Sequence, residues 1–192
     1  MNKRGQKTKK ATGSIRIIAG KHRGRKLSVI DAQGLRPTTD RVKETVFNWL
    51  MPYLQDASCL DCFAGAGSLT FEAISRGVAS AVAIELNGQA ASQLENNKQV
   101  LQANNLTIEQ GDALTHLKQP NQQFDIVFVD PPFNQQLVAK TIAALNNGWL
   151  AEDALIYIEM ESNTPLDDLP ANWQLIKEKI AGQVAFRLFQ TQ

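Results

Sequence analysis

Apolar residues along the chain follow two alternating patterns. Continuous apolar runs of a few residues, which predict buried strands, occupy residues 58–63, 81–84, 106–109, 124–129 and 154–159. Apolar residues at helical spacing predict helices at about 40–53, 68–76, 89–101 and 137–145. Strands that alternate with helices indicate an α/β protein with a mostly parallel, doubly wound sheet.

The two ends of the chain depart from this alternation. Near the N-terminus, residues 15–19 and 27–30 predict two short strands around a basic loop punctuated by glycines. Residues 173–179 and 184–189 predict a closing antiparallel hairpin. The tail that opens the chain has almost no apolar residue, so we expect it to be disordered without a partner. The expected organisation is a basic tail at 1–14, a basic β-hairpin extension at 15–35 and one domain at 36–192.

Charge is distributed unevenly, although the net charge is only +1. Residues 1–43 hold 13 of the 20 Lys and Arg together with two acids and carry +11, whereas the remainder carries −10. This asymmetry favours nucleic acid as the partner of the basic part, with a merely solvated tail as the alternative. The expected phosphate contacts are Lys21, His22, Arg23, Arg25, Arg36, Arg41 and Lys43.

The first predicted helix has a single apolar face. Its members are Val42, Val46, Trp49, Leu50 and Tyr53. Arg41 and Lys43 fall off that face, so we expect them in solvent, where they can reach a phosphate or simply stay hydrated. Pro52 is expected to bend or end the helix.

Cysteine usage and hydropathy exclude several classes of protein. Cys59 and Cys62 form one C-x-x-C with no second pair and no nearby His, so we expect no metal site. Positions three apart on a strand point to opposite faces, and two buried, reduced thiols suit a reducing cytosol. There is no secretory leader and no apolar run near 18 residues, so we expect a cytoplasmic protein without a membrane span.

The apolar run at 124–129 ends in Asp130-Pro131-Pro132-Phe133. Prolines cannot donate to a sheet ladder, so the strand should stop here, at the edge where open α/β sheets bind ligands. Asp130 and the Pro131 carbonyl can accept the two N–H groups of an amine attached to an aromatic base, while Phe133 stacks on the ring. A plain strand-to-loop exit is the alternative.

A glycine-rich turn with Gly65 and Gly67 follows the strand at 58–63 and opens a helix. The third glycine of the dinucleotide fingerprint is missing, which disfavours NAD. Glu85 lies 18 positions after Gly67, near the spacing expected for an acid that binds a ribose. Asp61 with Gly65 and Gly67 would form a backbone notch for an amino-acid tail, Glu85 would bind the ribose, and Asp112 would bind an adenine amine. This chain order fits S-adenosylmethionine.

Four segments together resemble a known family, namely residues 17–24, 35–44, 60–67 and 130–133. From residue 15 on, the chain resembles the class I methyltransferases and, more closely, the bacterial small-subunit ribosomal RNA guanine-N2 methyltransferases of the RsmD type. It departs from the family at 68–70, where a smaller residue and a glycine are frequent. The resemblance implies a Rossmann-like class I methyltransferase fold.

The resemblance and the residue chemistry converge on one expected site. Its catalytic residues are Asp130, Pro131 and Phe133. The expected cofactor-binding residues are Asp61, Phe63, Ala64, Gly65, Gly67, Glu85, Leu86, Asp112 and Ala113, and the expected cofactor is S-adenosyl-L-methionine.

The expected reaction is methylation of the exocyclic N2 of one guanine in small-subunit (16S) ribosomal RNA, as naked RNA or in the assembled small subunit. A DNA or RNA adenine-N6 methyltransferase is the nearest alternative, because it uses a similar D-P-P-aromatic edge. A non-catalytic protein that binds RNA or the ribosome with a relic nucleotide fold is the alternative from another class. A dehydrogenase is disfavoured by the missing glycine.

Overall fold

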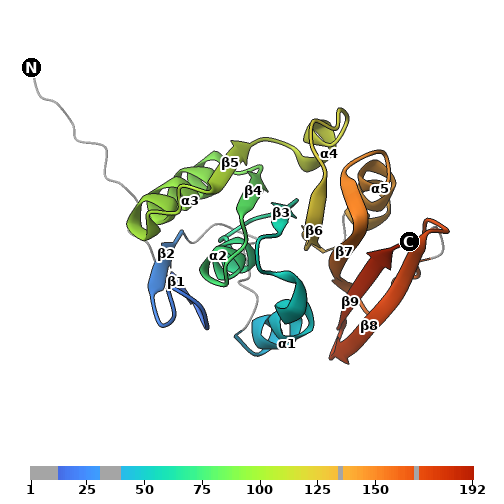
Figure 1. Cartoon of the computed structure of the whole chain (residues 1–192), viewed down its shortest axis with the longest axis horizontal. Coiled ribbons are helices and arrows are strands. Elements are labelled where there is room, and N and C mark those ends of the chain that lie inside the picture. Colours follow the sequence, from blue (N-terminus) through green and yellow to red (C-terminus); the bar gives the residue numbers. More distant parts are fainter. Residues whose placement is uncertain (1–12, 31–39, 134–135, 167–168) are drawn as a thin grey trace, which may run out of the picture.

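The computed structural model describes residues 13–30, 40–133, 136–166 and 169–192. Its centre is a seven-stranded sheet with the order β5-β4-β3-β6-β7-β9-β8 (Figure 1). The strands from β5 to β7 pair in parallel, and β9 and β8 add antiparallel pairs, as the sequence predicts. The strands are β3 Ser58–Asp61, β4 Ser80–Glu85, β5 Leu106–Gln110, β6 Phe124–Val129, β7 Leu150–Glu161, β8 Trp173–Ala181 and β9 Val184–Thr191.

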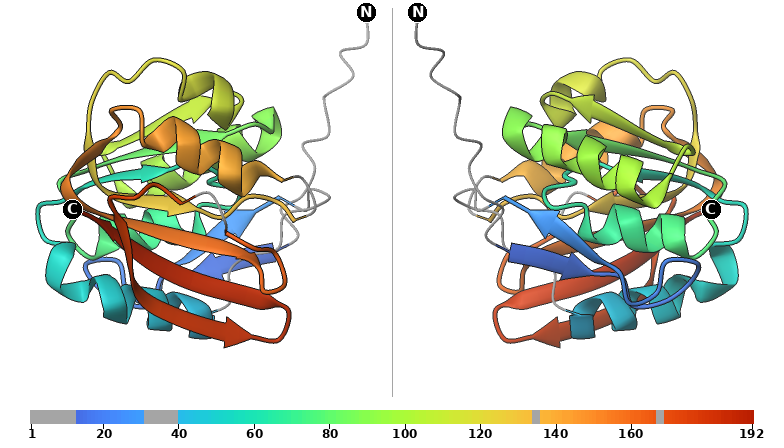
Figure 2. Two further views of the ribbon diagram at one scale, coloured as in Figure 1. Left: turned by 90° about the vertical axis from the view of Figure 1, so that its right-hand side faces the viewer. Right: turned by 90° about the vertical axis from the view of Figure 1, so that its left-hand side faces the viewer.

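Helices cover both faces of the sheet and make three layers. The helices are α1 Asp40–Leu50, α2 Ser68–Ser75, α3 Gly88–Leu101, α4 Ala113–His116 and α5 Leu137–Leu145, and a 3-10 turn, η1 Met51–Tyr53, extends α1. α1, α2 and α3 share one core, and α4 and α5 share the other. Figure 2 shows α1 and α5 on opposite sides of the sheet. No helix in the described part of the chain is long and apolar enough to cross a membrane.

β6 lies in the middle of the parallel strands, between β3 and β7. Its residues from Ile126 to Val129 are completely buried, because each face of the strand is covered by a helical layer. β6 ends at Val129, before the two prolines, as expected. Cys59 and Cys62 are buried, free thiols in opposite cores, which confirms the prediction that both are buried and point to opposite faces.

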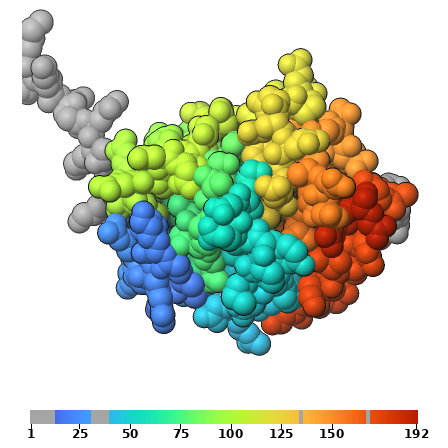
Figure 3. Space-filling view, in the orientation of Figure 1, coloured from blue at the N-terminus to red at the C-terminus, as the bar shows by residue number. Residues whose placement is uncertain are grey.

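The basic hairpin is β1 Gly13–Arg16 paired antiparallel with β2 Lys26–Val29. Both strands sit slightly earlier than expected, because the Ile17 N–H and carbonyl already close the turn with Arg25 and Gly24. The apolar side chains of the hairpin, Ile15, Ile17, Leu27 and Val29, join the core that α1, α2 and α3 share. Figure 3 shows the blue hairpin packed against the green helices, so it is part of the body of the protein.

The buried face of α1 differs from the predicted one. Phe47 is fully buried and its ring lies 6.0 Å from that of Phe128, whereas Tyr53 is 47% exposed. The prediction that Lys43 lies off the apolar face is wrong, since Lys43 is only 1% exposed. Its ammonium donates to the Arg16 carbonyl at 2.5 Å, and this partner offsets the cost of burying the charge.

Candidate active site

The carboxyl ends of four adjacent parallel strands bring four acids to one edge of the sheet. Asp61 is the last residue of β3 and pairs in register with Ala83 and Phe128. Glu85 ends β4, Asp112 follows β5, and Asp130 follows β6. We call this edge the carboxyl rim. The four acids are far apart in the sequence, and the parallel topology is what assembles them.

The glycine-rich turn lies above Asp61 and begins α2. Gly65 and Gly67 both have positive φ, 53° and 78°, which strains any residue with a side chain. A Cβ on Gly67 would lie 2.6 Å from the side chains of Phe71 and Leu94. Close packing and backbone conformation therefore both require glycine at position 67, since no side chain fits between the turn and its neighbours.

Asp61 is buried beneath this turn. Its Oδ2 accepts a hydrogen bond from the Thr70 hydroxyl at 2.6 Å. Burial raises the pKa of Asp61 to about 6, although the hydrogen bond from Thr70 opposes the shift. Asp61 Oδ1 and the neighbouring Ser68 hydroxyl are buried and have no hydrogen-bond partner among the described residues. Such unpaired polar atoms are costly, so the floor of the turn is suited to a polar ligand group.

Glu85 holds the turn together from β4. One carboxylate oxygen accepts the Gly65 N–H at 2.7 Å and the other accepts the Asn87 N–H at 2.7 Å. The turn is further tied to β4 by the Ala64 N–H, which donates to the Ile84 carbonyl at 2.9 Å. Any ribose hydroxyl would bind the remaining lone pairs of a carboxylate whose orientation is already fixed.

We call the glycine-rich turn together with Asp61, Ser68 and Glu85 the notch. The other predicted cofactor residues lie around the notch and differ in how deeply they are buried. Leu86, directly after β4, is 70% exposed, an apolar side chain available to a planar ring. Asp112 caps α4 by accepting the Thr115 N–H at 2.7 Å, and Ala113 behind it is buried. Phe63 is half-buried at the start of the turn.

The predicted catalytic residues follow β6 directly. Asp130 is partly buried, Pro131 is buried, and Phe133 is 39% exposed. On the neighbouring strand β7, the Tyr157 hydroxyl donates to Glu159 Oε2 at 3.0 Å. Burial raises the pKa of Tyr157 well above its ordinary value, and the charges of Glu159 and Asp130 raise it further. Sequence reasoning missed both Tyr157 and Glu159, because the apolar run around them indicates only a strand.

The basic loop at 17–25 is fixed to α2 by a second buried carboxylate. Glu72 accepts the N–H groups of Ile18 at 2.8 Å and Ala19 at 3.1 Å, and the Arg76 guanidinium at 2.7 Å. The Ser75 carbonyl accepts the Lys21 N–H at 2.7 Å. The sequence carried no signal for Glu72, because a single acid on an otherwise apolar helix does not show what it binds.

The predicted RNA-binding residues are therefore not equivalent. Lys21, Arg23 and Arg25 are exposed on the loop, and Arg25 also donates to the Val100 carbonyl at 3.1 Å. His22 is largely buried, and its pKa is lowered by burial and by the charges of Lys21 and Arg25. Arg23 thus presents its charge outward, whereas His22 packs inward.

The contacts predicted around α1 are divided as well. Arg41 is exposed, and Arg36 lies outside the described residues, as does the tail at 1–12. The Lys43 ammonium bonds to the hairpin backbone and lies 3.5 Å from the Asp40 carboxylate. It joins α1 to β1, which is a structural position and not one that faces solvent.

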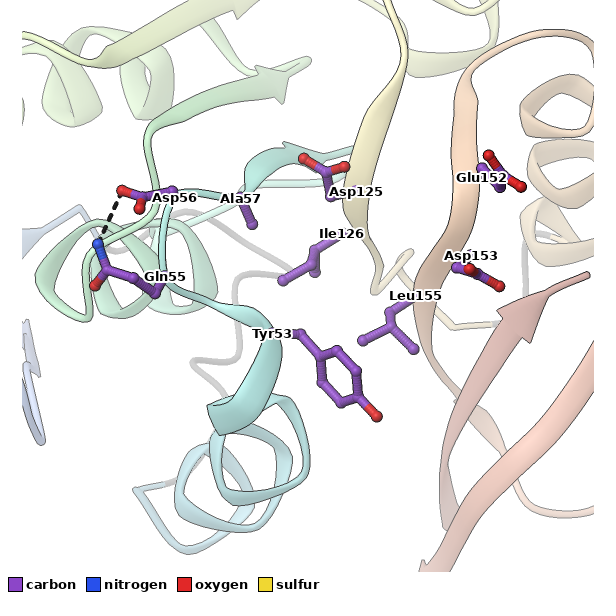
Figure 4. A pocket seen from close by; sticks show the side chains of 9 residues that line it. All are labelled: Tyr53, Gln55, Asp56, Ala57, Asp125, Ile126, Glu152, Asp153 and Leu155. Carbon is purple, nitrogen blue, oxygen red and sulfur yellow. Dashed lines mark hydrogen bonds between the residues drawn. The ribbon is translucent and has the colours of Figure 1, made fainter.

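A cavity lies at the opposite edge of the sheet. It has a volume of about 320 Å³ and lies between the end of η1 and the starts of β6 and β7 (Figure 4). Its lining includes Tyr53, Asp56, Asp125 and Glu152. There Asp125 Oδ2 accepts hydrogen bonds from the backbone N–H and from the hydroxyl of Ser58, both at 2.7 Å. No group of three or more His, Cys, Asp or Glu suited to a metal occurs in the described part of the chain.

Comparison with known proteins gives a consistent result. The family model described as conserved hypothetical protein 95 matches residues 15–190. Ribosomal RNA small subunit methyltransferase D of Escherichia coli K12 is 53% identical over 182 residues, which cover 94% of this chain and 92% of the relative. The protein of the same name from Haemophilus influenzae is 50% identical over 188 residues, with 95% and 97% covered.

A solved structure shows the same fold. The structure of yhhF from Escherichia coli superposes with a TM-score of 0.89 at 51% identity and covers 94% of this chain and 99% of that one. The prediction of a Rossmann-like methyltransferase fold with a C-terminal antiparallel hairpin is therefore confirmed.

Proposed function

The chain belongs to the family described as conserved hypothetical protein 95, a family of small-subunit ribosomal RNA methyltransferases, and from this premise we propose that it methylates the exocyclic N2 of one guanine. The observation that carries the proposal is the carboxyl rim, where Asp130 follows the strand next to the one that carries Asp61 and the glycine-rich turn. A ligand bound in the notch and an amine held by Asp130 would thus meet at one edge.

S-adenosylmethionine is the methyl donor that fits the notch. Asp61 Oδ1 and the Ser68 hydroxyl, which have no hydrogen-bond partner in the described part of the chain, suit its charged amino-acid end. Glu85 suits the ribose diol, Leu86 the face of the adenine ring, and Asp112 the adenine amine. When bound, this cofactor supplies a methyl group activated by a sulfonium.

The catalytic residues act on the amine of the base. Asp130 and the Pro131 carbonyl each accept one N2–H, and Phe133 stacks on a base turned out of its helix or loop. The N2 lone pair, otherwise conjugated into the ring, then points at the methyl carbon. With the methyl group supplied by the cofactor, N2 would give up one proton, which Asp130 or water would accept. Alignment supplies much of the rate enhancement.

The substrate is small-subunit ribosomal RNA, either free or in the assembled subunit, and the exposed basic loop grips its phosphates. An enzyme with this substrate acts in the cytoplasm, where ribosomes are made. An adenine-N6 methyltransferase remains the second candidate, because the D-P-P-F edge alone does not distinguish the two amines.

Mapping decides between these candidates. Methylated nucleotides in small-subunit RNA are compared between cells with and without this gene, by mass spectrometry of nuclease fragments. A single N2-methylguanine that depends on the gene supports the proposal, whereas a gene-dependent N6-methyladenine overturns it.

The role of Asp130 is tested with Asp130→Ala. We expect the rate of methyl transfer to fall by a factor of about 1000 or more, because both the orientation of the amine and the proton acceptor are lost. Affinity for S-adenosylmethionine, measured by calorimetry, should stay within about threefold of wild type. Normal turnover in this variant contradicts the assignment.

A further inference from the structure

Glu159 is the neighbour of Asp130 on the adjacent strand. β6 and β7 pair in parallel, with Phe128 opposite Tyr157 and Val129 opposite Ile158. The next position on each chain is Asp130 on one side and Glu159 on the other. Side chains in register on parallel strands point to the same face. Continued by one position, this register brings the two carboxylates to the carboxyl rim on the same face, the face covered by α1.

The Tyr157 hydroxyl holds the Glu159 carboxylate. Tyr157 is completely buried, and its ring lies 6.4 Å from that of Phe128, edge to face. Its hydroxyl donates to Glu159 Oε2 at 3.0 Å. A buried aromatic residue in a central strand is a rigid donor, so it fixes the direction of the Glu159 carboxylate. A carboxylate has about four acceptor sites, so one held in this direction can accept a further N–H.

Guanine is the base whose edge matches two adjacent carboxylates. Its N1–H and its N2 amine are neighbouring donors on the Watson–Crick edge. Ionised carboxylates only accept hydrogen bonds, and bonds from N–H to a charged acceptor are about twice as strong as neutral ones. Adenine presents an acceptor at N1, which would face a carboxylate lone pair and be repelled.

We propose that Glu159 selects guanine by accepting its N1–H while Asp130 holds the N2 amine, and that Tyr157 positions Glu159 for this contact. The inference rests on the proposed function and deepens it, because it names the residue that distinguishes guanine from adenine. Asp130 orients the reacting nitrogen, whereas Glu159 recognises the atom beside it.

The test pairs a protein change with a substrate change. Once the methylated guanine is mapped, small-subunit RNA is assembled from a synthetic fragment that carries guanine or 2-aminopurine at that position. 2-Aminopurine keeps the reacting amine but has no N1–H. For wild type, we expect kcat/KM to fall by about 10- to 100-fold with 2-aminopurine, the usual scale for a good base contact.

In Glu159→Gln the charge is lost, and kcat/KM on guanine RNA should fall by about 10-fold or more. The ratio of kcat/KM on guanine RNA to kcat/KM on 2-aminopurine RNA should decrease to about threefold. Tyr157→Phe removes one hydroxyl without changing shape, so the ratio should narrow partly. The matched control is Glu152→Gln, which lies on the same strand at the opposite edge of the sheet. This control should keep the wild-type ratio.

The outcomes separate the two proposals. If wild type adds no methyl to guanine RNA, the proposed function fails. If wild type methylates guanine but Glu159→Gln, with normal S-adenosylmethionine affinity, keeps the wild-type ratio, only the role of Glu159 is overturned. Should Glu159→Gln fail to fold, Glu159→Asp replaces it. This variant keeps the charge but shortens the side chain, so the preference for guanine over 2-aminopurine should fall partly, and an unchanged preference overturns the role of Glu159. A full wild-type preference in Tyr157→Phe overturns the role of Tyr157.

Discussion

The contact between the basic loop and α2, and the notch at the carboxyl rim, each contain a buried carboxylate. Glu72 in the first region accepts two backbone N–H groups and a guanidinium. Asp61 in the second region has the Thr70 hydroxyl on one oxygen, and its other oxygen has no hydrogen-bond partner among the described residues. A satisfied buried charge holds parts of a protein together, whereas an incompletely satisfied one indicates where a ligand completes the structure.

The largest expected effect on stability comes from removing the Glu72 carboxylate, whose hydrogen bonds are all made inside the protein. Glu72→Ala leaves the N–H groups of Ile18 and Ala19 and the Arg76 guanidinium without their acceptor. We expect the free energy of unfolding to fall by about 3–5 kcal/mol, the usual cost of breaking a buried ion pair. Urea unfolding followed by circular dichroism measures it.

The matched control for that change is Glu95→Ala. Glu95 is a half-exposed acid on α3, paired with Lys98 at 3.6 Å. Its removal should change stability by no more than about 0.5 kcal/mol. Equal losses in the two variants would contradict the special position of Glu72.

The next largest effect has the opposite sign and concerns Asp61. Its folded pKa of about 6 lies above the unfolded value of 3.8. The folded protein therefore binds this proton more tightly than the unfolded chain does. The resulting stabilisation is fully present below about pH 3.8 and is lost as the pH rises through about 6. At pH 7.5 the charge costs about 3 kcal/mol by this shift.

Asp61→Asn removes that charge, so the cofactor-free protein should gain about 1–3 kcal/mol at pH 7.5, since the unpaired amide N–H groups cancel part of the gain. The gain should be much smaller at pH 4. Affinity for S-adenosylmethionine should fall by about 10-fold or more. Denaturation at both pH values and calorimetry check these points, and a destabilised variant at pH 7.5 would refute the assignment.

A smaller effect tests whether Lys43 belongs with the structural region. Lys43→Met keeps the length of the side chain but leaves the Arg16 carbonyl without its donor. We expect a loss of about 1–2 kcal/mol in stability and no change in RNA affinity. Arg41→Ala, at an exposed position nearby on α1, should lower RNA affinity and leave stability unchanged. Reduced RNA affinity in a fully folded Lys43→Met protein would restore it to the RNA-binding set.

The smallest effect on stability is expected at the tip of the basic loop. Lys21→Ala combined with Arg23→Ala changes two exposed side chains, so unfolding should shift by less than about 0.5 kcal/mol. RNA affinity should fall, and the slope of log affinity against log salt should decrease by about two, one for each lost phosphate contact. An unchanged slope in filter binding would show that the loop does not touch phosphate.

Much of the architecture could be read from the sequence. The run at 124–129 and its two prolines place β6 and its end correctly, because burial on both faces and the missing N–H groups are local properties. The helix at 137–145 is found at its predicted bounds. The buried face of α1 was predicted less well, because Lys43 finds a partner on β1, which is distant in the sequence.

The sequence by itself determined the alternation of strands and helices, the narrow glycine-rich turn and the acids at the ends of strands, since each depends on neighbouring residues. Only the tertiary structure decided which acids are satisfied. Glu72 meets the basic loop more than 50 positions away, and strand pairing brings Glu159 next to the end of β6. Whether a buried charge supports the fold or waits for a ligand depends on partners that chain folding brings to it, and no local pattern records them.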